Sequence, residues 1–470
     1  MNWKNIFKSL KSSDMRNRVL AVLGIIIVYR FLAHIPVPLA EPTQLKDIIS
    51  QTISSNSFGG FLNLLSGGAL ASFSIMLVGL APYITASIIS QLLTKAVPKL
   101  EEMHKDGESG RRRINQWTRI VTLPLAIMQS IAFIFILRQT VLSGATTIAE
   151  MDMVQWTMAV SAMTAGAMML MWLGEIITEK GIGNGISLLI FAGIISQLPN
   201  TMGMLWTSIT TPGDNPFHLF NWFEISFLNH TATWMALGIG LIGLAVLYLL
   251  VKINEGQRII TINYAKRVHG NSQYGGVKSI LPIKLITAGV IPVIFAVAFL
   301  ALPAFLGQLM VASGWNVELG QNLILWFQRT SANGFSTASD WHQWIYPITY
   351  FMLVVAFTYF YTSIVFNANE ISENLQKQGG FIEDVRPGKQ TEKYLTKVVN
   401  RLTLFGSLTL GLIAVLPFLF EYIFVQLGQG TAAQNLAIGG TGLLIVVSVA
   451  LESIRQLNSR ALMVTYDEYK

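Results

Sequence analysis

Residues 57–93 read SFGGFLNLLSGGALASFSIMLVGLAPYITASIISQLL, and two kinds of segment meet within this stretch. Residues 70–93 are apolar and long enough for a helix to cross the roughly 30 Å of hydrocarbon in a bilayer. Residues 57–69 are too short and too rich in Gly to do so. Backbone at membrane depth needs protein or water to satisfy its polar groups. The stretch therefore predicts a re-entrant segment inside a cavity, with a plain external loop as the alternative.

The rest of the chain has the composition of a protein that crosses a membrane many times. Of its 470 residues, 52% are hydrophobic and 12% are charged, against about 25% charged residues in ordinary soluble domains. We expect an all-α polytopic membrane protein with ten transmembrane helices. They fall near residues 19–38, 70–93, 117–138, 154–178, 183–204, 232–252, 284–308, 345–367, 396–421 and 436–456.

The N-terminus carries no sign of a cleavable signal peptide. The first apolar run, 19–35, is long for a signal segment and lacks a small-residue cleavage site after it, so we expect it to be the first membrane helix. Residues 1–18 are polar and basic, with spaced apolar side chains. That pattern is typical of an amphipathic helix on the membrane surface.

Lysine and arginine residues set the orientation of the spans. Counting each helix end with its nearest loop, all but four of the 32 lie on the side of the N-terminus. Arg30 lies within the first span, and Lys46, Arg138 and Arg329 fall on the opposite side. Because basic loops remain in the cytoplasm, we expect both termini there, with residues 457–470 as a cytoplasmic tail.

The spans divide into two halves of five helices. Residues 19–204 form the N-terminal half and 232–456 the C-terminal half, and an external hinge loop without Lys or Arg joins them over 205–231. Five spans per half suit an inverted repeat, because an odd number flips the second copy. No clear internal sequence identity supports that repeat.

Two large loops, near 253–283 and 368–395, lie on the predicted cytoplasmic side. The first alternates apolar and polar residues before a Gly/Asn turn, which predicts a β-hairpin. The second places turn residues around basic ones. Together they suggest a docking surface for a large cytosolic partner, although the orientation rule alone explains most of their charge.

The sequence lacks the motifs of common enzymes. It contains no Cys, no Walker A loop, and no His spacing that suits a metal. We interpret the glycine-rich run 181–185 as a tight turn between two membrane helices. Ionisable residues within apolar runs are few and include Arg30 and Glu175, and an ion-coupled transporter needs carboxylates nearer the midplane. We therefore expect a passive conduit without cofactor or enzymatic activity, with an inverted-repeat secondary transporter as the main alternative and a pore-less scaffold as another.

Several strings spread along nearly the whole chain resemble the SecY family, the channel subunits of bacterial Sec protein translocases. In family order they are 66–93, DGESGRRRINQWTR (106–119), MWLGEIITEKGIGNGISLLIFAGI (171–194), NYAKRVHG (263–270), AGVIPVIF (288–295), FYTSIVFNANEISENLQKQGGF (360–381), VRPGKQT (385–391) and GGTGLLIVVSVAL (439–451). The resemblance implies two pseudo-symmetric halves around a central pore, through which unfolded polypeptides cross the membrane or leave sideways into lipid.

The resemblance also implies roles for individual residues. A short re-entrant plug would seal the pore, formed by Phe58, Gly59, Gly60, Phe61, Leu62, Asn63, Leu64 and Leu65. An apolar pore ring would comprise Leu80, Ile84, Ile186, Ile190, Ile294 and Ile445. Gln91 and Asn184 match positions in a lateral gate. Docking of a motor or ribosome would involve Arg258, Lys266, Arg267, Arg386 and Lys389.

The partners that the resemblance implies are the small membrane subunits SecE and SecG, the motor ATPase SecA, the ribosome, and polypeptides that bear a signal sequence. The location it implies is the lipid bilayer of the bacterial cytoplasmic membrane. Five sites depart from the family pattern, of which Leu80 in place of Ile in the ring is a mild change. Ser72 and Ile286 stand where Arg and Asn are frequent, Asn271-Ser272 replace a basic pair, and Glu383-Asp384 interrupt an apolar-Pro-Gly run.

Overall fold

The structure is a computed structural model that describes residues 12–37, 74–140, 153–211, 216–219, 223–264, 267–269, 272–274, 278–327, 341–426, 442 and 445–460. Helices occupy the positions of all ten predicted spans. They are α2 (Ser13–Leu32), α5 (Ala81–Ala96), α7 (Glu108–Thr140), α8 (Met153–Lys180), α9 (Gly185–Thr210), α10 (His230–Glu255), α11 (Ile291–Ser313), α13 (Ile345–Val365), α15 (Lys389–Gln426) and a last helical run over 445–460. Six of the described helices are long and apolar enough to cross a membrane by length and composition.

Two predictions at the N-terminal side fall partly or wholly outside these residues. The predicted plug, 58–65, lies outside them, as do residues 1–11 of the predicted surface helix. Residues 13–18 were also assigned to that surface helix, and this was wrong, because they form the first turns of α2. Ser12 caps this helix by accepting a hydrogen bond from the Met15 backbone N–H at 3.4 Å.

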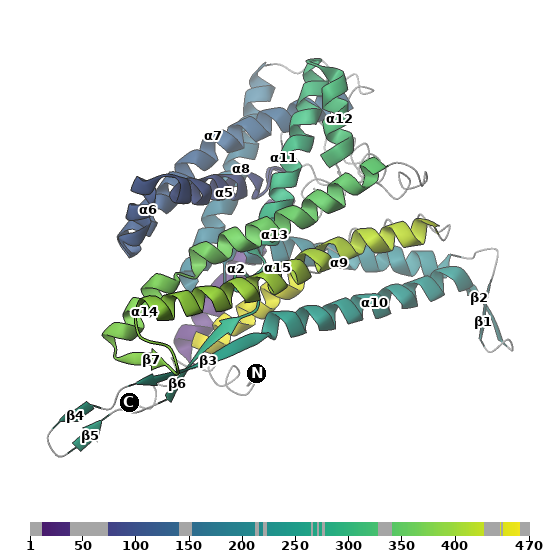
Figure 1. The fold of residues 1–470 in the computed structure, drawn as a ribbon. Coiled ribbons are helices and arrows are strands. Elements are labelled where there is room, and N and C mark those ends of the chain that lie inside the picture. Colours follow the sequence, from purple (N-terminus) through teal and green to yellow (C-terminus); the bar gives the residue numbers. More distant parts are fainter. Residues whose placement is uncertain are drawn as a thin grey trace.

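The helices diverge, with α7, α8 and α11 on one side and α9, α10 and α15 on the other, and strands lie at both ends of α10 (Figure 1). At one end lies the antiparallel pair β1 (Pro216–Leu219) and β2 (Phe223–Asn229), within a stretch that the sequence predicted to be a loop. At the other end lie the remaining strands, and we call this the sheet end. Shorter helices complete the described fold: α6 (Pro98–Lys105), α12 (Val317–Phe327), η2 (Trp341–Trp344) and α14 (Ala368–Lys377).

Two membrane helices begin later than the apolar pattern predicts. Residues 70–93 and 284–308 were expected to be helical throughout, but α5 begins at Ala81 and α11 at Ile291. Before each helix a glycine adopts left-handed backbone, with φ of +63° at Gly79 and +64° at Gly289. A proline in the first turn then fixes helical φ without needing an N–H partner.

These two helix starts share one sequence pattern, Gly-x-x-Pro-x-Ile, over residues 79–84 and 289–294. The residue that precedes each helix also has nearly the same backbone angles, −88°/−1° at Leu80 and −90°/−12° at Val290. The structure therefore reveals a short repeat between the two halves that we did not detect in the sequence. It places Ile84 and Ile294 at equivalent positions, each five residues after its glycine.

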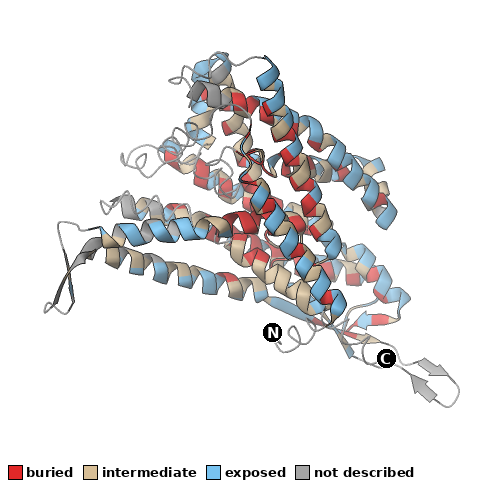
Figure 2. Ribbon diagram, turned by 180° about the vertical axis from the view of Figure 1, so that it is seen from behind, coloured by how far each residue is buried: buried red, intermediate tan, exposed pale blue. Residues whose placement is uncertain are grey.

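The apolar side chains divide between a core and the outer surface. One buried cluster collects residues from α2, α5, α8, α9, α10, α11, α13, α15 and the last helical run. Leu237, Leu241 and Leu244 of α10 remain more than half exposed, and the outer faces of the long helices are largely exposed in Figure 2. A helix that is apolar on both its inner and its outer face suits a bilayer, not water.

The sheet end is built from both predicted loops. Strands β3 (Gln257–Tyr264) and β6 (Lys278–Lys284) pair antiparallel, and β4 (Arg267–His269) pairs with β5 (Ser272–Tyr274) beyond them, which confirms the predicted hairpin. On its other edge β3 pairs with β7 (Gly380–Ile382) from the second loop. A small apolar core that includes Ile260, Ile382 and Leu395 fixes this sheet to the start of α15.

Candidate functional site

The six residues that match the pore ring lie in one apolar cluster at the centre of the bundle. Ile84, Ile190, Ile294 and Ile445 are buried within it, and Leu80 and Ile186 are partly buried and pack against it. They come from the turn before α5, from α5 itself, from α9, from α11 and from the last helical run. The structure thus gathers residues from both halves of the chain into one apolar region. Their role as a ring remains a prediction.

The turn between α8 and α9 places Ile186 and Ile190. Gly181 and Gly183 have φ values of +72° and +146°, which disfavour any residue with a side chain. At Gly185 a Cβ atom would collide with the carbonyl oxygen of Gly174 on α8. The interpretation of 181–185 as a tight turn with close packing is confirmed.

Asn184, a predicted gate residue, is the N-cap of α9. Its side-chain oxygen accepts hydrogen bonds from the backbone N–H groups of Ile186 at 3.1 Å and Ser187 at 3.4 Å. The Gly185 N–H donates to the Thr178 hydroxyl at 2.9 Å. This capping satisfies the first turn of the helix that carries two ring residues.

Gln91, the other predicted gate residue, lies in the penultimate turn of α5. Its Nε2 donates to the Ser87 hydroxyl at 3.1 Å, four residues earlier on the same helix. Its Oε1 is buried and has no hydrogen-bond partner among the described residues. The structure therefore does not join Gln91 to Asn184: both make their hydrogen bonds within or next to their own helices.

The departure at Ile286 has a packing explanation. Ile286 is 6% exposed in the turn before α11, and it belongs to the central apolar cluster. A Cβ atom added to Gly406 of α15 would lie 2.5 Å from the carbonyl oxygen of Leu285 and 3.5 Å from Ile286 Cγ1. An apolar side chain fills this close approach between the start of α11 and α15. Ser72, the other departure near the predicted plug, lies outside the described residues.

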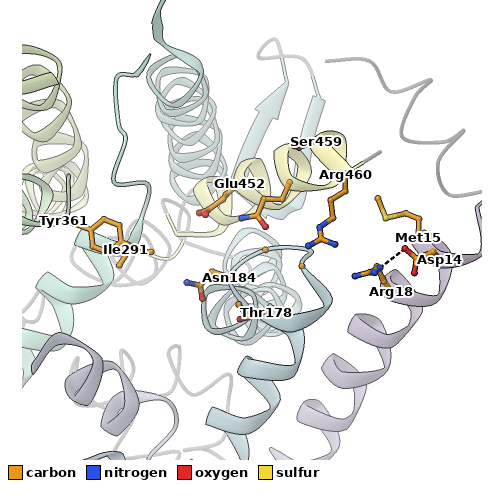
Figure 3. Close-up of a pocket in the computed structure, with 13 residues that line it drawn as sticks. Asp14, Met15, Arg18, Thr178, Asn184, Ile291, Tyr361, Glu452, Ser459 and Arg460 are labelled. Atoms are coloured by element: carbon orange, nitrogen blue, oxygen red, sulfur yellow. Dashed lines mark hydrogen bonds and ion pairs between the residues drawn. The ribbon is translucent and has the colours of Figure 1, made fainter. Parts of the chain in front are cut away.

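A cavity of about 690 Å³ lies where the α8–α9 turn faces the last helical run (Figure 3). Its walls come from the start of α2, the α8–α9 turn, α11, α13 and the last helical run. Its lining residues are Asp14, Met15, Arg18, Thr178, Gly181, Gly183, Asn184, Ile291, Tyr361, Glu452, Gln456, Ser459 and Arg460. The lining is polar around the α8–α9 turn and includes residues from both halves of the chain.

Charged contacts hold together the elements around this cavity. Arg18 pairs with Asp14 at 2.9 Å and donates to the Lys180 carbonyl at 3.2 Å, which links α2 to the end of α8. Arg455 donates to the Asn254 side chain at 3.2 Å, which links the last helical run to the end of α10. In β6, burial and the neighbouring Arg455 lower the pKa of Lys284, while Glu452 opposes this shift.

The predicted docking residues divide between the sheet and the hairpin beyond it. Arg258 on β3 is exposed, as are Arg386 and Lys389 after β7. Because β7 pairs with β3, the two loops that carry these three cations join in one sheet, whereas the sequence assigned them to two separate loops. Arg267 lies in β4, opposite Tyr274 of β5, and Lys266 lies outside the described residues.

The departure at Glu383-Asp384 lies in the turn after β7. Asp384 has φ of +62°, left-handed backbone that Asp and Asn adopt more readily than most residues. The Thr391 hydroxyl donates to the Arg386 carbonyl at 2.9 Å, and the Ser372 hydroxyl donates to the Gly388 carbonyl at 2.8 Å. The turn that presents Arg386 is therefore held by hydrogen bonds from α14 and from the start of α15, despite the departure.

Comparison with known proteins decides the family. The model of the SecY family matches residues 74–454. The chain belongs to the SecY family. Its relatives include the protein translocase subunits SecY of Corynebacterium glutamicum, 40% identical, and of Mycobacterium tuberculosis and Streptomyces scabiei, each 38% identical; every match covers 98% of both chains.

Solved structures share the SecY fold. One concerns the plug domain of SecY and the closed state of the translocation channel, with a TM-score of 0.60 at 17% identity. Another is of a protein-conducting channel, with a TM-score of 0.58 at 18% identity. Each comparison covers 93% of this chain and 90% of the other. Membership of the SecY family makes this chain a multi-pass membrane protein of a channel family, and it disfavours the alternative of a secondary transporter.

Proposed function

We propose that the chain is the channel subunit of a protein translocase in the bacterial cytoplasmic membrane. It conducts unfolded secretory polypeptides across the bilayer and releases the helices of membrane proteins sideways into lipid. The observation that carries this proposal is the match to the SecY family over residues 74–454, and the central apolar cluster that contains the six predicted ring residues is consistent with it.

The chemistry of the ring explains how one opening both seals and conducts. A narrow apolar constriction offers water and ions few partners, so it dewets and resists leakage. Aliphatic side chains such as those of Ile84 and Ile294 make contacts without direction, so they adapt to any passing sequence. The matched turns before α5 and α11 hold these two residues at equivalent positions in the two halves.

The lateral exit runs along the seam where the two halves meet. Helix α11 of the C-terminal half contacts both α5 and α7 of the N-terminal half. Parting α11 and α13 from α5 and α7 opens the pore toward lipid. The plug, which we assign to residues 58–65, closes the external side at rest. Gln91 donates its hydrogen bond within its own helix, and its buried Oε1 is the atom that would accept one across the seam, which would shift the balance between closed and open seam by about 1 kcal/mol.

The sheet end faces the cytoplasm and receives the partners that supply polypeptide. Its orientation follows from the Lys and Arg distribution, which also places both termini there. A solved relative, Sec61 in a canine ribosome–channel complex, shares the fold with a TM-score of 0.55 at 18% identity. We infer that Arg258, Arg386 and Lys389 contact the ribosome or SecA, because arginine forms paired bonds with carboxylate or phosphate. SecE and SecG complete the complex in the membrane.

Reconstituted translocation tests this function. Proteoliposomes that contain the chain with SecE and SecG receive SecA, ATP and a radiolabelled precursor, and protease is then added outside. We expect a protected, full-length precursor only when its signal sequence is present. Two results would contradict the proposal: protection of the precursor in liposomes that lack the chain, or uptake of small solutes without ATP and without any protected precursor.

A further inference from the structure

A row of cations runs along one outward face of α15. Lys393, Lys397 and Arg401 are spaced by four residues, so they lie one above another on the same side of the helix. All three are exposed, and within the described part of the chain none of them pairs with a carboxylate. These cations therefore do not serve the internal ion pairs of the fold.

The cations line a cavity of about 710 Å³ beside α13, which packs along α15 (Figure 1). Its lining residues are Tyr359 of α13 and Glu392, Lys393, Thr396, Lys397, Asn400, Arg401 and Leu404 of α15. The lining thus carries three cations against one carboxylate, and Glu392 lies at the end farthest from the apolar part of the helix. The hollow is suited to an anion.

The position of the cavity along α15 matches the edge of a bilayer. Residues 402–420 carry no charged side chain, and 19 helical residues rise about 28 Å, close to the thickness of the hydrocarbon core. Arg401 therefore stands where the apolar span begins, and Lys397 and Lys393 stand in the headgroup layer. Tyr359 lies beside them, as is common for an amphipathic ring at the membrane interface.

The same helix face continues as apolar surface into the membrane. Leu404, Leu408 and Leu412 repeat the four-residue spacing and are 52%, 45% and 55% exposed. A ligand that binds here would meet cations at one end and a leucine row at the other. Soluble phosphate would leave the leucine row unused, and an acidic protein helix would have to enter the bilayer. A phospholipid has both parts in the correct order.

We propose that the α13–α15 cavity binds an anionic phospholipid. Its phosphate accepts hydrogen bonds from Arg401 and Lys397, Lys393 faces the anionic part of the headgroup, and one acyl chain lies on Leu404 and Leu408. Arginine at the boundary suits a phosphate because its planar fork donates two parallel hydrogen bonds. Helix α13 also takes part in the proposed lateral exit, so the bound lipid contacts one of the helices that part when the exit opens.

The absence of Cys from the sequence allows a direct test. Leu408→Cys, one turn below the cavity lining, carries a bimane fluorophore in the chain reconstituted with its small subunits. Vesicles contain either phosphatidylglycerol or phosphatidylcholine with brominated acyl chains, at equal bromine content. We expect phosphatidylglycerol to quench this label more strongly than phosphatidylcholine does. The quenching should correspond to a relative affinity on the order of fivefold higher, the preference that one local charge provides. At Ile131→Cys on the outer face of α7, we expect equal quenching by the two lipids.

Matched variants assign the effect to the cavity. In K393Q/K397Q/R401Q the preference should vanish, whereas K393R/K397R/R401K should retain it. The matched control is R113Q/K278Q/K377Q, which removes the same number of positive charges from exposed sites elsewhere. Equal quenching by both lipids in the parent chain, or a preference that survives the first triple substitution, overturns the proposal.

Two further outcomes separate other occupants from a lipid. Loss of the quenching preference when glycerol phosphate is added in excess would assign the cavity to a soluble phosphate. A label at Leu408 that neither lipid quenches would show that a protein covers this face. Either result overturns the lipid assignment, and neither bears on whether the chain conducts polypeptide.

Discussion

At the scale of single residues, glycines and one asparagine determine how the ring-bearing helices begin. Gly185 has no space for a methyl group because the Gly174 carbonyl of α8 lies against it. The sequence indicated a tight turn here, because several glycines interrupt an apolar run. It did not indicate which glycine makes the closest contact, since that depends on how two helices approach each other.

Gly185→Ala should destabilise the chain by about 2 kcal/mol or more, because backbone on two helices must separate. Gly203→Ala on the same helix is the matched control: a Cβ there meets no atom within 4 Å. Removing that helical glycine should stabilise by up to about 1 kcal/mol. Thermal unfolding in detergent measures both changes. Equal effects of the two substitutions would contradict the packing described for the α8–α9 turn.

Asn184 allows a capping role to be separated from a gating role. Asn184→Ala should lower stability by about 1 kcal/mol through loss of the N-cap, whereas Asn184→Ser should retain most of it. If the amide also acts in the gate, the Ser variant will keep its unfolding temperature but export precursors with altered signal sequences at a different rate. An Ala variant as stable as the parent would show that the cap is unimportant.

At the scale of elements, the local signals were predictable and the long-range pairings were not. Apolar blocks and flanking cations are local, so the positions of ten helices could be predicted. Apolar residues such as leucine and valine continue through the turns before α5 and α11. The apolar pattern therefore could not show that these helices begin late. Strand β7 has only three residues, and it becomes a strand only because β3 from another loop lies beside it.

The pairing of β7 with β3 is expected to support docking. Ile382 is 5% exposed in the small core beneath the sheet, so Ile382→Ala should cost about 2–4 kcal/mol. Amide hydrogen exchange in β3, opposite β7, should then accelerate, and SecA affinity should fall. Phe381→Ala is the control, since Phe381 is 39% exposed on the same strand. Unchanged exchange in β3 after Ile382→Ala would show that the sheet does not depend on β7.

At the scale of the whole molecule, two five-helix halves share one apolar centre. Only the family resemblance pointed to the six ring residues, because each is an ordinary aliphatic side chain in an apolar helix. Burial in the structure places them in one cluster but does not distinguish them from other core residues. Their function therefore has to be tested by what crosses the membrane.

A polar ring should leak ions. Ile84→Ser combined with Ile294→Ser wets the constriction, so we expect resting conductance in planar bilayers to rise at least about tenfold. Met128→Ser on the outer face of α7, which is 65% exposed, should leave conductance unchanged. Equal conductance in the parent and the ring variant would mean that these two residues do not form the seal.

The most direct test places a translocating polypeptide against the ring. One cysteine replaces Ile84 or Ile190, a second is placed in a stalled secretory chain, and disulfide formation is measured with SecA and ATP. We predict a SecA-dependent crosslink at both ring positions and none at Met128→Cys. A chain that docks and inserts without crosslinking to either ring position would contradict the assignment of the central cluster as the pore.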